Sequence, residues 1–406
     1  MVQDLISSSK SDLTPAEGSI VSLAKATVHL PPEPPEAALL LYVLRQQFSP
    51  AASTIGASRG TSQRELSEGV DWNAFNRLAV AHRVAPLVYR YFQGHPGELP
   101  AEVLAQLRQQ IRATGFRNLV LTRELVRLAG VFADAGIDFL PLKGPLLAHQ
   151  LYGDVSQRQF GDLDILVRPC QLGEARELLT REGYRYQDGW DSWRQRAYER
   201  FGHHYGYYHP LKSVQVEMHW RVLPQNVRFA IEVPEFWARL ERCAIAGVPV
   251  PCTPAEDLLL MLTAHGSRHH WERLNWICDI AALLEARPDL DWQVVEQRAR
   301  RLGAVRMLDL GLLVAHDVLG APLPAGAAGR LEVDRMTREL GADVRAMLFA
   351  GINFEAAVGI RWRYFLRLRE RLPHRLSYVV GQTVNSLFWR VISWGSRDEA
   401  DRSSIA

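Results

Sequence analysis

Two aspartates, Asp162 and Asp164, are separated by a single residue in the stretch GDLDILVR. Alternate side chains of a β-strand point the same way, so both carboxylates would share one face while Leu163 and Ile165 turn toward a core. Carboxylates roughly 6.6 Å apart along a strand repel each other unless a cation lies between them. Magnesium prefers such ligands and joins them to substrate phosphates. The pair predicts a metal site; the alternative is a turn at Gly161 followed by a capping aspartate.

A glycine turn precedes this acidic strand. The letters FLPL predict a short buried strand that ends at Lys143 and Gly144. Pro145 suits the first turn of the helix that follows, because its missing N–H leaves no hydrogen bond unmade. The amides at such a helix start favour anions, and Lys143 adds a positive charge for a polyphosphate. Arg158, four residues before Asp162, is a further candidate for binding the nucleotide.

A later stretch, VQVEMHW, alternates as a β-strand does and places Glu217 and His219 on one face with Gln215. A third carboxylate is commonly needed to hold two metal ions for in-line phosphoryl transfer. Glu217 is the best candidate for it, the alternative being an exposed strand position. Together with Asp162 and Asp164, it predicts a catalytic, metal-binding site of three carboxylates.

These residues resemble the nucleotidyltransferase superfamily, which has a DNA polymerase β-like fold, and in particular its uncharacterised branch of nucleotidyltransferase family proteins. In that superfamily a glycine turn and a helix precede a strand with an Asp-hydrophobic-Asp pair, and a later strand supplies the third acid. The resemblance covers most of the chain. It implies that Asp162, Asp164 and Glu217 hold the metal and that Lys143 and Gly144 form the turn that binds the nucleotide.

The chain departs from the family pattern at Pro145, where typical members have a serine that touches a phosphate, so Lys143 is the candidate to replace that contact. The resemblance implies transfer of a nucleoside monophosphate from an NTP, such as ATP, with Mg²⁺ or Mn²⁺. The acceptor would be a hydroxyl or phosphate of a small molecule, a peptide or a protein. Glu217 is also the candidate to accept the proton of the acceptor.

Two other functions remain open. An Asp-x-Asp pair also binds the metal-diphosphate of a sugar nucleotide, and relatives in this branch accompany natural-product peptide clusters, so glycosyl transfer in peptide tailoring is one alternative. The common sugar-nucleotide enzymes expect a larger parallel sheet before the acidic pair, whereas the chain before residue 136 is mostly helical in pattern. The other alternative is a non-catalytic nucleotide-binding module, which predicts that nucleotide binding does not depend on magnesium and that all three carboxylates tolerate replacement by alanine.

Histidines form a second group of candidates. His265 and His269 are four residues apart, but glycine follows the first where zinc proteases have glutamate, which argues against zinc. With Asp279 they either line the active-site cleft and bind nucleotide or acceptor, as the branch's recurrent histidine-containing helix implies, or are hydrogen-bonded packing residues. His203 and His204 are predicted to lie in a surface loop, the alternative being an approach to the site.

Composition sets limits on partners and location. The 406 residues include 47 basic and 45 acidic side chains, for a formal charge of +2, so nothing in the overall charge favours nucleic acid. No apolar stretch comfortably spans a bilayer, so no membrane span is expected. The four cysteines show no metal-type spacing and no secretory signal is present, which predicts reduced thiols and a cytoplasmic location.

The pattern of elements predicts an α+β protein with a small mixed β-sheet nucleotidyltransferase core flanked by helical regions. A long helix is expected from Pro100 to about Ala135, and a packing helix or an RNA-, triphosphate- or membrane-binding segment at 361–371. The predicted domains are a mostly flexible extension with one helix (1–63), a helical region (64–135), the nucleotidyltransferase core (136–225) and a helical C-terminal domain (226–406).

Overall fold

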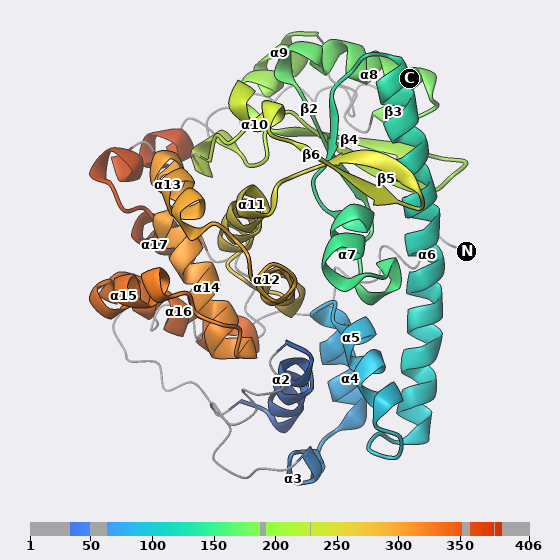
Figure 1. The fold of residues 1–406 in the computed structure, drawn as a ribbon, viewed down its shortest axis with the longest axis vertical. Coiled ribbons are helices and arrows are strands. Elements are labelled where there is room, and N and C mark those ends of the chain that lie inside the picture. The colour runs from blue at the N-terminus through green and yellow to red at the C-terminus, as the bar shows by residue number, and fades with distance from the viewer. Residues whose placement is uncertain are drawn as a thin grey trace, which may run out of the picture. The chain divides into compact units, whose positions relative to one another are not determined.

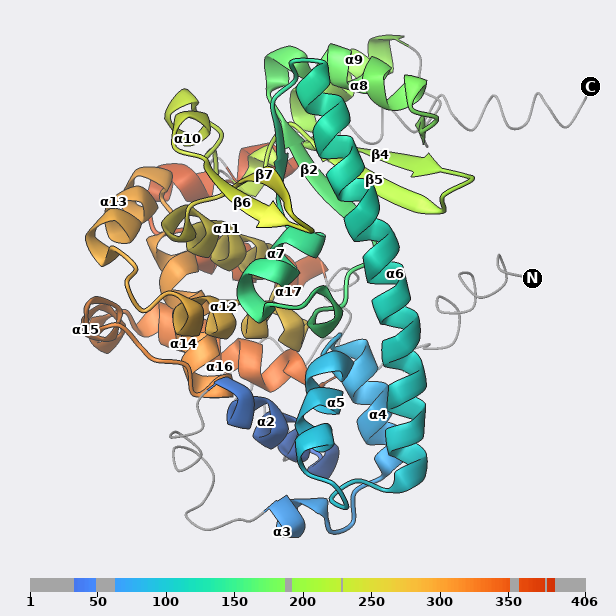
Figure 2. The ribbon, with the colours of Figure 1, turned by 45° about the vertical axis from the view of Figure 1, so that its right-hand side comes forward.

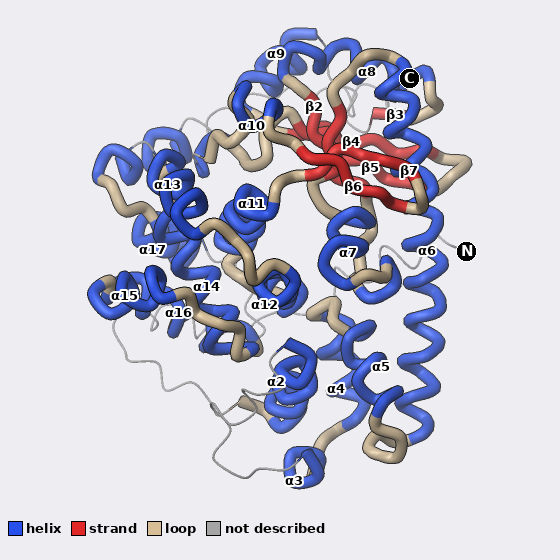
Figure 3. Tube along the Cα trace, viewed as in Figure 1, coloured by secondary structure: helices blue, strands red, loops and turns tan. Residues whose placement is uncertain are grey.

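A computed structural model of the chain describes residues 33–48, 63–186, 192–227, 229–350, 358–376 and 378–383. The α+β class is confirmed: a five-stranded mixed sheet and a two-stranded sheet lie among helices (Figure 1, Figure 3). The described residues from Pro34 onward form one compact unit. The predictions for residues 1–32 and 49–62, and for the terminal helix beyond residue 383, lie outside the described residues. Within those residues, no helix combines the length and apolar character that crossing a membrane requires.

The first described part of the chain is helical, as predicted. Its short helices are α2 (Pro35–Phe48), α3 (Gln63–Ser67), α4 (Trp72–Ala81) and α5 (Ala85–Gly94). Asp71 caps α4 by accepting hydrogen bonds from the amides of Asn73 and Ala74. The turn between α4 and α5 contains Arg83, whose φ of 57° lies in the left-handed region.

The long helix α6 (Ala101–Asp134) runs beside the sheet at one end and beside α4 and α5 at the other (Figure 1, Figure 2). Leu121, Leu125 and Leu128 are buried on its inner face, as predicted. The prediction that Leu119 is a core residue is wrong, because this side chain is 61% exposed. It lies about 200° around the helix from Leu121, so it points away from the sheet.

The five strands follow the spatial order β1-β2-β5-β4-β3. They are β1 (Phe139–Pro141), β2 (Leu163–Val167), β3 (Arg185–Tyr186), β4 (His204–His209) and β5 (Val214–His219). Strand β2 pairs in parallel with β5 and antiparallel with β1, and the β4–β5 hairpin is antiparallel. The two strands predicted to carry the carboxylates are therefore neighbours.

Both faces of the sheet are covered. Ile165 and Val167 of β2 join a buried cluster with Leu125 and Leu128 of α6, whereas Leu166, on the face of Asp164, belongs to the cluster that unites the helices. The connecting helices are α7 (Gly144–Tyr152), α8 (Leu172–Arg181), α9 (Ser192–Phe201) and α10 (Pro234–Ala238).

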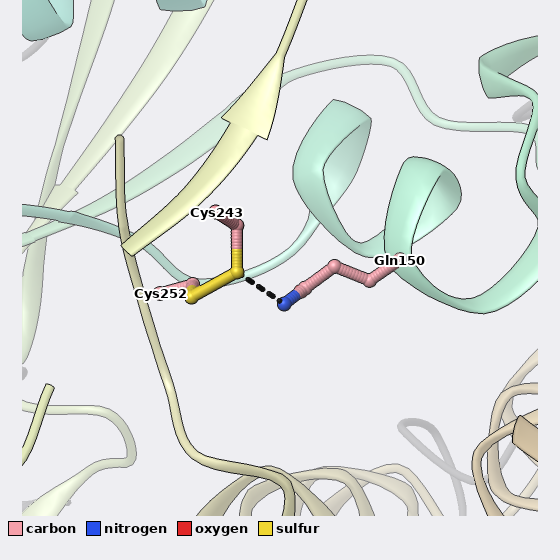
Figure 4. Close-up of a disulfide and its surroundings, with 3 residues drawn as sticks. All are labelled: Gln150, Cys243 and Cys252. Atoms are coloured by element: carbon pink, nitrogen blue, oxygen red, sulfur yellow. Dashed lines mark hydrogen bonds between the residues drawn. A yellow bond between two sulfur atoms is a disulfide. The ribbon is translucent and has the colours of Figure 1, made fainter. Parts of the chain in front are cut away.

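A second small sheet, which the sequence analysis did not predict, follows α10. Its strands are β6 (Glu241–Ile245) and β7 (Val248–Cys252). A disulfide joins Cys243 to Cys252 across this hairpin, and Gln150 Nε2 of α7 donates a hydrogen bond to Cys243 Sγ at 3.1 Å (Figure 4). The expectation of four reduced thiols is wrong for this pair; Cys170 and Cys278 are free. Spacing did not reveal the pair because only the hairpin register brings its Cα atoms to 5.9 Å.

The rest of the described chain is helical, as predicted. It comprises α11 (Ala255–Arg268), α12 (Leu274–Ala286), α13 (Trp292–Leu302), α14 (Val305–Leu319), α15 (Ala325–Val333), α16 (Arg335–Leu348) and α17 (Val358–Leu368). The basic helix α17 packs back on α16, where Arg367 forms salt bridges with Glu339 and Asp343. This contact agrees with the interpretation of the segment as a packing helix.

Candidate active site

The three predicted carboxylates come together where β2 and β5 lie side by side. Asp162 directly precedes β2, and Asp164 within it is opposite Glu217 in the parallel register. Asp164 is buried, with 8% of its surface exposed, and Glu217 is half-buried. The alternation of side chains along each strand thus places all three on one face, as expected.

The lysine-glycine turn reaches the same place from β1. Lys143 Nζ lies 3.6 Å from Asp164 Oδ1. Gly144 begins α7 with a φ of 63°, a conformation that glycine adopts without strain, and a Cβ there would also lie 3.5 Å from the carbonyl oxygen of Asp162. Leu142 N donates to Asp164 O at 3.0 Å, so β1 and β2 hold the turn against the acidic strand.

His219, at the end of β5, lies within reach of two of the carboxylates. Its Nε2 lies 3.2 Å from Asp164 Oδ1 and 3.5 Å from Glu217 Oε2. Burial alone would lower the pKa of His219, but the hydrogen bonds to Asp164 and Glu217 raise it above its usual value. The sequence analysis placed His219 on this face but assigned it no role. Its spacing of two residues from Glu217 is the signal that indicates a role beside that carboxylate.

The carboxylates differ in acidity because their partners differ. Burial, together with the charges of Asp164 and Glu217, raises the pKa of Asp162 to about 6. Burial would also raise the pKa of Asp164, but Lys143 and the hydrogen bond from His219 hold it well below its usual range. The hydrogen bond from His219 also lowers the pKa of Glu217.

Helix α6 positions the loop that leads into Asp162. Arg117 donates to the carbonyl oxygens of Ser213 and Gly161, at 2.6 and 3.1 Å. The buried Asn118 donates to the carbonyl oxygens of Val155 and Arg158, at 2.7 and 2.8 Å. Neighbouring residues of one helix therefore hold both the β4–β5 turn and the approach to β2.

Arg158 forms a buried ion pair instead of pointing to solvent. Its Nε and Nη2 donate to the Asp279 carboxylate of α12, at 2.9 Å each, and Tyr152 Oη donates to the same carboxylate at 3.0 Å. Arg158 is 6% exposed and Asp279 1%. The structure thus shows Arg158 engaged with a protein carboxylate, and its predicted role as a nucleotide ligand remains a prediction.

His265 and His269 lie together near the end of α11. Their ring centroids are 4.7 Å apart, and both rings contact Trp276. Arg268 Nη1 donates to His269 Nε2 at 2.8 Å. Burial lowers the pKa of both histidines, and the charge of Lys143 contributes to the shift at each. Both rings are therefore close enough to Lys143 for its charge to affect them, and their nucleotide-binding role remains a prediction.

Arg83 is a candidate residue of the active site that the sequence did not reveal. The turn that carries it is fixed to the start of α12, because Leu274 N donates to His82 Nδ1 at 3.3 Å and Asn275 N donates to His82 O at 3.2 Å. Burial and the charge of Arg273 lower the pKa of Arg83, while the charges of Asp162 and Asp164 raise it. Arg83 is half-buried and forms no salt bridge with any residue that the structure describes. No local pattern signals this role, because the turn lies far from the acidic strand in sequence.

The donor set fits a divalent cation. Asp164, Glu217 and His219 each offer one ligand atom, and the three atoms lie within 4.8 Å of one another. Asp162 adds a further carboxylate from the same face. Hard oxygen donors of this kind suit Mg²⁺ or Mn²⁺. His265 and His269 belong to no such group among the described residues.

The fold and site together define a class of enzyme. An Asp-x-Asp strand lies parallel to a strand with a third carboxylate, beside a lysine-glycine turn, which is the arrangement expected of a nucleotidyltransferase. The chain belongs to the family described as uncharacterised nucleotidyltransferase, which matches residues 68–320, more than half of its length.

Other comparisons are less informative. No curated protein matches the chain. Among solved structures, the antibiotic-resistance factor ANT(2'')-Ia, studied in solution, is similar over 45% of this chain and 90% of its own, at 15% identity. The TM-score of 0.31 is too low for an argument from that similarity. The chain is a transferase by family, and its acceptor has to be sought from its own residues.

Proposed function

We propose that the protein transfers a nucleoside monophosphate from an NTP to a hydroxyl or phosphate of an acceptor, with Asp162, Asp164 and Glu217 as metal ligands. The observation that carries this proposal is the pairing of Asp164 with Glu217 across two parallel strands, with Lys143 Nζ 3.6 Å from Asp164. A bound Mg²⁺ or Mn²⁺ would neutralise charge on the triphosphate and on the leaving pyrophosphate.

The chain's own cations orient the triphosphate. Lys143 lies at the glycine turn, and Arg83 approaches the carboxylates from the α4–α5 turn with no carboxylate partner among the described residues. A guanidinium can bind a phosphate through two parallel hydrogen bonds, so Arg83 is suited to a terminal phosphate. Lys143 takes over the contact that relatives make with the serine replaced here by Pro145.

The reaction replaces one oxygen on the α-phosphorus by another. The acceptor oxygen forms a bond to the α-phosphorus, the bond to the bridging oxygen breaks, and pyrophosphate leaves. Glu217 is also the candidate to accept the proton of the acceptor as the acceptor oxygen attacks. Most of the acceleration comes from positioning and from neutralisation of charge.

The test measures transfer directly. The protein is incubated with each NTP and Mg²⁺ together with candidate small-molecule and peptide acceptors, and mass spectrometry seeks a gain equal to one nucleoside monophosphate. The same assay follows pyrophosphate release. Asp162→Asn and Asp164→Asn are expected to lower both signals at least about 100-fold, because charge stabilisation at the transferring phosphate is lost.

The matched control is Asp138→Asn, which changes an exposed carboxylate paired with Arg168 just before β1 and should keep full activity. Circular dichroism confirms that each variant is folded. Undiminished NTP turnover in folded Asp164→Asn would refute the assignment. A hexose gain from a sugar nucleotide would instead establish glycosyl transfer.

A further inference from the structure

Three histidines gather beside the carboxylates at the junction of β4 and β5. His203 directly precedes β4, His204 begins it, and His219 ends β5 opposite His204 in the antiparallel register. The backbone of His203 is bound to the residues that follow β5, because Trp220 N and Arg221 N both donate to His203 O, at 3.0 and 3.3 Å. The expectation of a surface loop at His203 and His204 is therefore wrong: the hairpin pairing extends through them.

The ring nitrogens of these histidines converge. His203 Nε2 and His204 Nδ1 are 3.1 Å apart, and one nitrogen from each of the three rings lies within 4.8 Å of the others. Two imidazoles bound to one metal at about 2.1 Å have nitrogens roughly 3.0–3.4 Å apart. The first pair thus already has the spacing of two ligands of one metal ion.

The nitrogens are also available. The hydrogen bond between His203 and His204 is the one that either side chain makes with residues the structure describes. His219 Nδ1 is buried and has no hydrogen-bond partner among those residues. A buried polar atom without a partner is costly, which favours a ligand that would satisfy it.

We propose that His203, His204 and His219 form a binding site for a transition-metal ion, next to the carboxylate site and distinct from it in chemistry. Imidazole nitrogens suit Zn²⁺, Co²⁺ and related ions, whereas Mg²⁺ prefers oxygen. Three protein ligands leave a coordination position open, as in catalytic zinc sites. The proposal does not require nucleotidyl transfer, since the ion binds without nucleotide.

The experiment uses metal binding alone. Chelator-treated protein without nucleotide is titrated with Co²⁺, whose visible absorption distinguishes nitrogen ligands in a site of low coordination number from six oxygen ligands. One Co²⁺ per chain is expected, displaced by Zn²⁺ but not by excess Mg²⁺. His203→Gln and the double variant His203→Gln/His204→Gln should weaken the binding, the double variant at least about 100-fold.

Two controls locate the ion. His149→Gln, which changes an exposed histidine of α7, should bind Co²⁺ as the unmodified protein does. Asp138→Asn should do so as well, because this exposed carboxylate pairs with Arg168 and belongs to neither group of converging ligands. An oxygen-type spectrum, displacement by Mg²⁺, or unchanged binding in the folded double variant would overturn the proposal and show hydrogen-bonded packing only. Each of these results is independent of whether the enzyme transfers a nucleotide.

Discussion

Asp164 is the carboxylate of the site that contacts both Lys143 and His219. It is buried next to Asp162 and Glu217, which is unfavourable for a carboxylate unless cations compensate. The charge of Lys143, from the glycine turn, and the hydrogen bond with His219, from the end of β5, supply that compensation. The chain thus stabilises the buried carboxylate with its own groups at the place where the proposed metal would bind, which lets three carboxylates fold into one site.

Arg83 gives a prediction at this scale. If it binds a terminal phosphate, Arg83→Gln removes a hydrogen bond to a charged group, worth roughly 1.5–3 kcal/mol. The value of kcat/KM for the NTP should therefore fall about 10- to 150-fold in steady-state kinetics. Glutamine keeps a polar side chain, shorter than that of arginine, without its charge. Arg77→Gln, which changes an arginine of α4 that is 70% exposed, is the control and should leave kcat/KM unchanged. Equal kinetics in the two variants would exclude Arg83 from the site.

Residues of the candidate site could be predicted only where their spacing within one short stretch of sequence indicates their position. Asp162, Asp164 and Glu217 follow the period of two that a strand imposes, so their shared face could be inferred from the sequence. The candidacy of Arg83 could not be inferred, since the position of its turn depends on hydrogen bonds of His82 to the start of α12. The partner of Arg158 was equally hidden, because Asp279 is 121 residues away.

Among the elements, helix α11 shows that a tertiary contact can outweigh the low helix propensity of residues near the end of the helix. Gly266 and Ser267 have low helix propensity, yet α11 continues to Arg268. Trp271, fully buried, folds back with a φ of 57°, and its amide donates to Gly266 O at 3.0 Å. A Cβ on Gly266 would lie 2.3 Å from the indole ring, so glycine is needed for this close approach. The contact fixes the end of the helix that carries His265.

The same substitution at two glycines should therefore have opposite effects. Gly266→Ala should destabilise the protein by about 1–3 kcal/mol, because the methyl group overpacks against Trp271. Gly130→Ala, at an exposed position inside α6 with nothing within 4 Å of the new methyl, should stabilise it by about 1 kcal/mol through helix propensity. Urea unfolding measures both. A stabilising Gly266→Ala would show that the indole moves away at little cost.

The β6–β7 hairpin is an element that the sequence pattern did not predict. Its second strand reads VPVPC, and proline is depleted in strands because it cannot donate to the ladder. In a sheet of two strands, however, an outward-facing proline leaves no partner unsatisfied, so the composition is tolerated. The longer elements with clear periodicity, above all α6, were predicted almost to their ends.

At the scale of the whole molecule, His82 joins helices from distant parts of the chain. It lies in the α4–α5 turn, accepts a hydrogen bond from Leu274 N of α12, and contacts the ring of Phe349 at the end of α16. Only a neutral ring can accept at Nδ1. Burial and the charge of Arg273 lower the pKa of His82 to about 4. Protonation at this junction therefore opposes the folded state as a whole.

The protein should consequently lose stability as the pH falls from 6.5 toward about 4. The folded pKa of about 4 lies below the unfolded value of 6.5, so between them the unfolded chain binds a proton that the folded one does not. The contribution of His82 is complete above pH 6.5 and is lost as the pH falls toward 4, with about 2 kcal/mol gone near pH 5. His82→Asn keeps an acceptor for Leu274 N without titrating, so urea unfolding should show a smaller loss between about pH 7.5 and about pH 5. His149→Asn, at an exposed position, should keep the full loss, and an equal loss in the two variants would remove His82 as its source.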